Sequence, residues 1–359
     1  MTVTNLSMER HIMQTQLLKC KINIKNNMTN KITTGINGFG RFGLHLLKYW
    51  LDRSEQSNFS IDFINDDFLD IDAMHNIIIS DTAVNFKKYK VQKRDGFLRF
   101  LRADGEEYQI AVSNKSKDKI DWIGEPQLFL ECSGKNTVRS ESACFLTGNT
   151  DRVIISATSW DPDTTLVYGF NHTELLDEHK IISYGSCTVN AYLPLANFIN
   201  ENFEVISSDV NCIHNIQEYQ LENNNTLLRK FCTLEKSATH LLNFISEENF
   251  IVNYTVIPYT GVSMIDFRFR VSEVPTIDNL KTILQEGVNE GSLKGLYGLC
   301  DLDTGPEPHN CTPYSSVIVK ENISIKQDSI YLPAYFDNEN SVNRYFDLVD
   351  YISDTHCNF

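Results

Sequence analysis

One glycine-rich turn constrains the fold of this chain more than any other segment. Its residues are Gly38, Phe39, Gly40, Arg41, Phe42 and Gly43. The turn follows residues 32–37, which we predict to be a strand, and opens a predicted helix with apolar residues at 44, 47 and 50. The first glycine of such a motif permits a tight turn, the second admits a pyrophosphate, and the third lets the helix pack on the strand. The helix N-terminus then favours the bound anion, so the pattern predicts a dinucleotide site.

The residues after the next predicted strand, 59–65, support a dinucleotide site. Asp66 lies 23 residues after Gly43, where an acid can accept hydrogen bonds from an adenosine ribose. Asp66 and Asp67 have no arginine beside them and would repel a 2′-phosphate, so we expect the cofactor NAD rather than NADP. The alternative is a loop glycine cluster with a surface aspartate, which the order of strand, turn, helix and acid disfavours.

Two kinds of pattern divide the chain. Residues 128–132 and 152–157 are predicted to be further buried strands, and the alternation of strands with helices indicates a parallel sheet. Residues 205–214 and 262–271 alternate as strands with one exposed face do, and residues 276–290 are predicted to be a helix. We therefore predict an α/β protein, with a Rossmann-type NAD-binding domain and an α+β catalytic domain whose sheet is mostly antiparallel.

Domain boundaries follow from the same patterns. Residues 1–30 are polar and are predicted to be a flexible N-terminal extension. We expect residues 31–186 to form the NAD-binding domain and residues 187–336 the catalytic domain. A C-terminal helix within residues 337–359 is expected to complete the first domain.

Composition excludes several classes of protein. The 359 residues include 32 Lys and Arg against 47 Asp and Glu, and this acidic balance argues against a general binder of nucleic acid or of an anionic membrane. No stretch approaches the ~18 apolar residues that span a bilayer, and the first 30 residues do not resemble a secretory signal. The nine cysteines include no Cys-x-x-Cys pair, so we expect reduced thiols, a cytoplasmic location and no metal site.

A cysteine at the start of a predicted helix is the candidate nucleophile. Cys187 precedes the apolar run 191–198, and a helix N-terminus lowers the pKa of a thiol by stabilising the thiolate. His214, at the end of a predicted strand, is the candidate base, since a Cys–His pair supplies a thiolate and a proton shuttle. The alternatives are an inert core cysteine and a structural histidine, and spacing alone does not choose His214 over the other histidines.

The chain resembles the glyceraldehyde-3-phosphate dehydrogenase family over residues 31–352. The segments that carry this resemblance follow the family in order and spacing. They are INGFGRFG at 36–43, INDDFLDID at 64–72, ECSGK at 131–135, VIISATS at 153–159, KIISYGSCTVN at 180–190, YLPLANFI at 192–199 and FDNENSVNR at 336–344.

The resemblance implies roles for individual residues. Cys187 matches the nucleophile that adds to the aldehyde, and His214, 27 residues later, matches the base. The glycine-rich turn matches the pyrophosphate-binding turn, and Asp66 matches the ribose acid. Ser133 falls in a loop beside the cofactor, and Asn338 matches the residue that holds the nicotinamide carboxamide. The implied reaction oxidises an aldehyde with NAD through a hemithioacetal and a thioester on Cys187.

The departures from the family concern the anion sites. The family's phosphate-binding arginine is replaced by Val256, and its Ser-Thr-Gly-Ala turn aligns loosely with residues 234–237, where Glu235 opposes an anion. The substrate-binding residues that the resemblance implies are Ser186, Thr188, Gln217 and Lys236. Replacement charge is available from Arg229, Lys230 and Lys236, although a solvated loop face explains them as well. The loop after residue 220 is shorter than in the family, which puts the usual tetramer in doubt, but we expect a homo-oligomer.

We therefore expect an NAD-dependent aldehyde dehydrogenase of this family's type, acting on a small-molecule aldehyde or acyl substrate that need not be glyceraldehyde 3-phosphate. Two alternatives stay open. One is an ordinary glycolytic, phosphorylating glyceraldehyde-3-phosphate dehydrogenase, and the other is a non-catalytic NAD-binding interaction protein.

Overall fold

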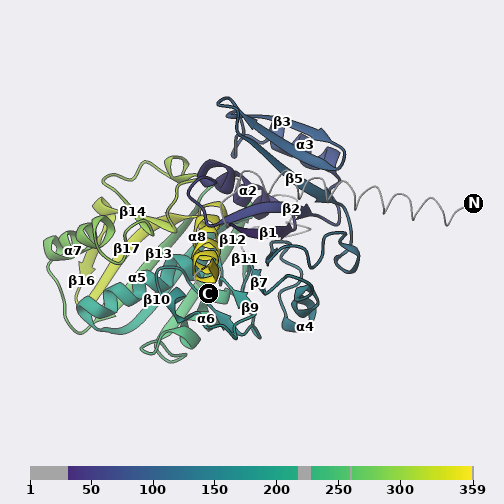
Figure 1. Ribbon diagram of the computed structural model, residues 1–359. Coiled ribbons are helices and arrows are strands. Elements are labelled where there is room, and N and C mark those ends of the chain that lie inside the picture. Colours follow the sequence, from purple (N-terminus) through teal and green to yellow (C-terminus); the bar gives the residue numbers. More distant parts are fainter. Residues whose placement is uncertain (1–30, 217–227, 259–260, 358–359) are drawn as a thin grey trace, which may run out of the picture.

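Two β-sheets with helices packed on them make up the computed structural model, which describes residues 31–216, 228–258 and 261–357 (Figure 1). The predicted extension, residues 1–30, lies outside the described residues. In the part described, no helix is both long enough and apolar enough to cross a lipid bilayer.

Sheet A carries the Rossmann-like half of the molecule, and β1 lies inside it between two parallel neighbours, β2 and β6. Its described strands, in spatial order, are β3 (Tyr89–Arg94), β4 (Phe97–Arg102), β5 (Glu107–Ser113), β2 (Phe59–Asn65), β1 (Ile32–Asn37), β6 (Leu128–Glu131), β7 (Arg152–Ile155), β9 (Ile181–Ser183) and β8 (Thr164–Thr165). The antiparallel pairs β3–β4 and β4–β5 extend one edge of the sheet, a feature that the sequence analysis did not predict.

Sheet B is mostly antiparallel, as predicted. Its described strands, in spatial order, are β11 (Leu228–Arg229), β12 (Phe250–Pro258), β10 (Val205–Ile216), β13 (Ser263–Val271), β17 (Ser329–Phe336), β15 (Ser316–Val319) and β14 (Tyr297–Cys300), with β16 (Ser324–Lys326) paired to β17. The pairs β10–β12 and β14–β15 are parallel. The predicted fold class is therefore confirmed.

The helices are placed by their apolar faces. Their bounds are α2 (Arg41–Arg53), α3 (Ile71–Ser80), α4 (Arg139–Ser142), α5 (Cys187–Phe203), α6 (Thr233–Leu241), α7 (Ile277–Asn289) and α8 (Asn338–Cys357). In α2 the side chains of Leu44, Leu47 and Trp50 are buried, since their spacing puts them on one face. Helix α5 is buried along most of its length, and its first residue is Cys187.

Helix α8 connects the two halves of the molecule. Val342, Tyr345 and Val349 lie in the same apolar core as residues of β1, β2 and α2. The Tyr345 hydroxyl also donates a hydrogen bond to the Ile154 carbonyl oxygen of β7 at 2.7 Å. Helix α8 contacts α5 as well as α2, and Figure 1 shows it, in yellow, near the middle of the molecule. The exact domain boundaries, after residues 186 and 336, stay a prediction.

Candidate active site

The glycine-rich turn leaves space for a ligand above Gly40, at the N-terminus of α2. Gly38 has φ +98°, and a Cβ there would lie 2.5 Å from the Ser133 backbone. A Cβ on Gly43 would lie 2.3 Å from the Gly38 carbonyl oxygen, whereas a Cβ on Gly40 would meet no protein atom within 4 Å. No side chain caps this end of α2. An uncapped helix end beneath open space fits a pyrophosphate group.

Alanine substitutions at two of these glycines should separate folding from cofactor binding. Gly43→Ala is expected to lower the free energy of unfolding by about 1–3 kcal/mol, because its methyl group overpacks the turn. Gly40→Ala meets no protein atom and has an ordinary φ of −73°, so its unfolding midpoint in denaturant should match that of the wild type. Its dissociation constant for NAD, measured by titration calorimetry, should rise roughly tenfold or more, since the methyl group occupies the pyrophosphate place. Unchanged NAD affinity in Gly40→Ala would contradict the assignment.

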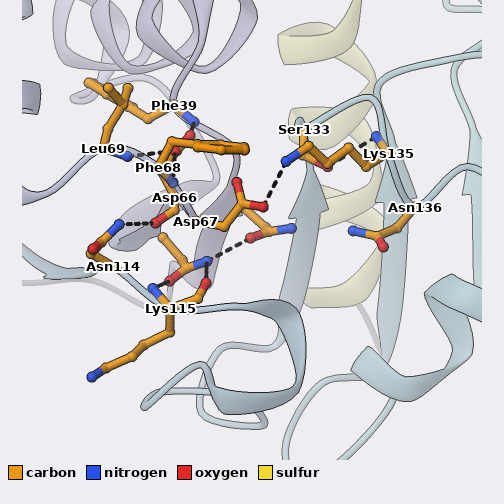
Figure 2. Close-up of polar contacts among 12 residues, drawn as sticks. Phe39, Asp66, Asp67, Phe68, Leu69, Asn114, Lys115, Ser133, Lys135 and Asn136 are labelled. Atoms are coloured by element: carbon orange, nitrogen blue, oxygen red, sulfur yellow. Dashed lines mark hydrogen bonds and ion pairs between the residues drawn. The ribbon is translucent and has the colours of Figure 1, made fainter.

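Asp66 ties the strand end of β2 to the glycine-rich turn. Its carboxylate accepts hydrogen bonds from the backbone N–H of Phe39 at 2.7 Å and from those of Phe68 and Leu69 at 2.9 Å each (Figure 2). The side chain is held in one orientation at the mouth of the turn. The predicted ribose acid and pyrophosphate turn are thus adjacent.

Glu131, at the end of β6, organises the loop that contains Ser133. Its buried carboxylate accepts hydrogen bonds from Asn37 Nδ2 at 2.7 Å, from Asn136 Nδ2 at 3.0 Å and from the Ser133 N–H at 2.8 Å. The Ser133 hydroxyl also donates to it. Burial raises the pKa of Glu131, and these donors oppose that effect. Ser133 is therefore fixed beside the end of β1.

Other predicted cofactor residues have internal contacts. The Arg41 guanidinium pairs with Asp81 and lies 3.5 Å from Glu339, which belongs to the first turn of α8. The Phe42 ring packs edge-on against Tyr184 and Tyr345, with centroids 5.7 and 5.2 Å away. Asn338 is the first residue of α8.

Cys187 and His214 are in contact. The Cys187 Sγ, at the start of α5, is 3.4 Å from Nε2 of His214, which lies in β10. His214 Nδ1 lies 2.5 Å from the Asn215 carbonyl oxygen. Because a carbonyl oxygen only accepts, Nδ1 carries the proton, and in the neutral ring Nε2 is the acceptor that faces the sulfur. The imidazole ring lies between Tyr254 and Phe336, with centroids 5.6 and 5.5 Å away.

The predicted lowering of the Cys187 pKa by the helix end is present, through the Thr188 N–H, but it does not set the net direction of the shift. Burial raises this pKa, the neighbouring Cys232 raises it further, and the Thr188 N–H opposes them. Only 7% of Cys187 is exposed, so loss of solvation outweighs one N–H at the helix end. Burial therefore favours the protonated thiol, and a proton acceptor such as His214 would assist formation of the thiolate.

Two residues that the sequence analysis missed hold His214 in place. The Asn215 N–H donates to Ser263 Oγ at 3.0 Å, and Ser263 Oγ donates to Asn215 Oδ1 at 2.6 Å. Both residues are buried, so the carbonyl that orients the imidazole is fixed by a closed pair of hydrogen bonds. The signal in the sequence was only that an Asn follows the candidate base at a strand end.

Hydroxyl groups gather beside the thiol. Ser186 Oγ lies 3.1 Å from Thr188 Oγ1, and Thr233 Oγ1 donates to Ser186 Oγ at 3.2 Å. Thr188 Oγ1 lies 3.6 Å from Cys232 Sγ. The residues that the structure brings to this place are thus 232–233, at the start of α6, rather than the segment 234–237 chosen from the loose alignment.

The segment 234–237 points elsewhere. Leu234 is buried in the core, and Glu235 accepts a hydrogen bond from the Val252 N–H at 2.9 Å. Lys236 Nζ lies 4.6 Å from the centroid of the Trp160 ring. Lys236 therefore packs against Trp160, and its role toward a substrate stays a prediction.

Val256, which the sequence analysis aligns with the family's phosphate-binding arginine, lies next to the candidate base. It is paired in register with His214 on the neighbouring strand, so the two side chains share a face of sheet B, and Val256 is 4% exposed. Arg229 pairs with Thr255 and so lies on the opposite face. Lys230 is exposed, and Gln217 lies outside the described residues. Arg229 therefore does not replace the missing charge at Val256.

No protein-family model matches the chain. Several curated proteins do, over nearly their whole length. Glyceraldehyde-3-phosphate dehydrogenase 2 of Drosophila pseudoobscura pseudoobscura is 27% identical over 334 residues, which cover 89% of this chain and 98% of the relative. The enzyme of that name from Mastigamoeba balamuthi is 27% identical over 333 residues, covering 88% and 96%. The cytosolic one from Taxus baccata is 25% identical over 345 residues, covering 91% and 99%. The two-sheet fold and this full-length homology make the chain a distant relative of the glyceraldehyde-3-phosphate dehydrogenases.

Proposed function

We propose that the protein is an NAD-dependent aldehyde oxidoreductase that works through a thioester on Cys187. The observation that carries the proposal is the 3.4 Å contact between the Cys187 sulfur and His214 Nε2, with His214 Nδ1 bound to a backbone carbonyl. A nucleophile whose base is oriented by a third group is the arrangement that covalent catalysis requires. The distant homology to glyceraldehyde-3-phosphate dehydrogenases supports the same mechanism.

The cofactor would bind at the carboxyl end of sheet A. The backbone of residues 38–43 would hold the pyrophosphate, and Asp66 would bind the adenosine ribose. Ser133 would lie beside the cofactor, and Asn338 would hold the nicotinamide carboxamide. The open place over Gly40 and the uncapped end of α2 fit this group. When bound, NAD supplies the acceptor for the hydride that the substrate loses.

His214 would act as the general base and general acid of the reaction. Its Nε2 takes the proton of the Cys187 thiol, and the thiolate adds to the aldehyde carbon. The same imidazole protonates the resulting alkoxide and later takes the hemithioacetal hydroxyl proton as the thioester forms. General-base help of this kind contributes roughly 10²–10⁴-fold. A backbone N–H at the start of α5, such as that of Thr188, would stabilise the oxyanion.

The hydroxyl cluster of Ser186, Thr188 and Thr233 would position the nucleophile that opens the thioester. These hydroxyls bind one another beside the sulfur and can donate to, or accept from, a small polar molecule. After losing the hydroxyl proton to solvent, the neutral His214 would take the proton of that nucleophile, and Cys187 leaves as the thiolate.

The proposed substrate is an aldehyde that carries no phosphate. A charge-assisted hydrogen bond contributes about 1.5–3 kcal/mol, and a bidentate arginine–phosphate pair is at the strong end. Val256 replaces the family's arginine, and Gln217 replaces the threonine that the family has three residues after the base. Losing both should therefore cost on the order of 10²–10⁴-fold in selectivity for a phosphorylated aldehyde.

A matched pair of substrates tests this function. NADH formation should be measured with glyceraldehyde and with glyceraldehyde 3-phosphate, each with and without inorganic phosphate. We expect kcat/KM for the phosphorylated aldehyde to be no higher than for the free one. Val256→Arg should raise it about tenfold for the phosphorylated substrate only, whereas the control Val256→Met should not. Robust phosphate-dependent turnover of glyceraldehyde 3-phosphate by the wild type would instead identify an ordinary glycolytic enzyme.

A further inference from the structure

One ion pair joins the two loops that border the proposed dinucleotide crevice. Lys135 lies in the loop after β6, and its Nζ is 2.7 Å from Asp67 Oδ2 in the loop after β2. Since β1 lies between these two strands, the pair spans the carboxyl end of β1. Figure 2 shows the Lys135 side chain extended towards Asp67. In open α/β sheets, this end of the strands, where the strand order reverses, is where ligands bind.

Asp66 and Asp67 are adjacent but have different surroundings. Asp66 is 8% exposed and accepts three backbone N–H groups, so it is committed to the turn and the ribose place. The Asp67 side chain is 41% exposed and pairs with Lys135. A phosphate on the ribose 2′-oxygen would therefore be repelled chiefly by the exposed Asp67 carboxylate.

A second contact keeps the Lys135 ammonium beside Asp67. Its Nζ lies 4.2 Å from the ring centroid of Phe68, a residue that is 80% exposed. The ring face attracts the cation independently of the carboxylate. The ammonium should therefore stay near this place when the Asp67 charge is removed.

We propose that Lys135 is a latent site for a ribose 2′-phosphate, and that Asp67 keeps this site occupied. The Asp67 carboxylate takes the position on the ammonium that a phosphate oxygen would take, and its charge repels the phosphate. This ion pair, rather than the absence of an arginine alone, sets the preference for the cofactor without a 2′-phosphate. The inference rests on the dinucleotide site of the proposed function and is independent of the chemistry at Cys187.

Binding measurements on the full chain test the proposal without turnover. Titration calorimetry should compare NAD with NADP, and 5′-AMP with 2′,5′-ADP. Asp67→Asn keeps the side-chain shape and should tighten binding of the two 2′-phosphorylated ligands about tenfold or more, while the other two change by less than about twofold. Lys135→Met should weaken the 2′-phosphorylated ligands, and the double variant should show none of the gain. The gain should also shrink as salt is added.

Lys115→Met is the matched control. Lys115 lies in the loop after β5 at the same end of the sheet, but Figure 2 shows its side chain directed away from Asp67 and Lys135. Its removal should leave all four affinities unchanged. An equal gain from Asp67→Asn with Lys135 present or absent would mean simple repulsion, and would overturn the latent site. If NAD and 5′-AMP bind but Asp67→Asn shifts nothing, this inference alone fails. If neither binds the wild type, the proposed function fails with it.

Discussion

Replacing Cys187 with serine is expected to lower the rate of NADH formation by on the order of 10⁴-fold or more. A serine hydroxyl is a far weaker nucleophile than a thiolate, and the 3.4 Å contact with His214 cannot compensate for that. Intact-mass spectrometry after mixing enzyme, aldehyde and NAD should show an acyl adduct on the wild type and none on the variant.

Cys232→Ser is the control for this experiment. Cys232 is also buried, and its Sγ lies 3.6 Å from Thr188 Oγ1. We expect this variant to keep the acyl adduct and most of the activity. An adduct that survives in Cys187→Ser and disappears in Cys232→Ser would show that Cys232, rather than Cys187, is the nucleophile.

Replacing His214 with glutamine should slow turnover by roughly 10²–10⁴-fold and change how the thiol responds to pH. Burial raises the pKa of Cys187, so without a base only a small fraction of the thiol is ionised at neutral pH. Below that pKa the thiolate fraction rises about tenfold for each pH unit. Alkylation of the variant by iodoacetamide should therefore be slow at neutral pH and accelerate steeply as pH rises.

The wild type should alkylate faster than the variant at neutral pH, because His214 Nε2 accepts the proton. Its rate should depend less on pH in the alkaline range. The reactivity is followed by peptide mass spectrometry at Cys187, with Cys232 as the internal reference. Equal neutral-pH rates in the two proteins would show that His214 does not act on this thiol.

The parts of the fold that repeat a local pattern were predictable from the sequence. The observed bounds of β1 and β2 coincide with the predicted strands 32–37 and 59–65, because a short apolar run next to a glycine-rich turn leaves few other readings. Helix α7 begins at Ile277 after a Thr276 cap, close to the predicted helix 276–290. These features depend on neighbours in sequence.

Features that depend on distant neighbours were not predictable. The helix-end argument for Cys187 used local geometry, whereas its pKa is set by burial that sheet B and α6 create. Thr233 was missed because the family's Ser-Thr-Gly-Ala turn was aligned only loosely, with residues 234–237. A helix start has no repeating apolar pattern that would have fixed this alignment. Lys135 reaches Asp67 across 68 residues of sequence, so no local pattern announces the pair.

The packing of α8 has a consequence for how the chain is made. The core under β1, β2 and α2 is completed by apolar side chains from the last helix, such as Tyr345 and Val349. During synthesis, the residues of β1, β2 and α2 leave the ribosome before those of α8 are made. Until then, part of the apolar surface that α8 covers stays exposed to solvent. A nascent chain with this apolar surface exposed is prone to aggregate, so chaperone binding should last until α8 has left the ribosome.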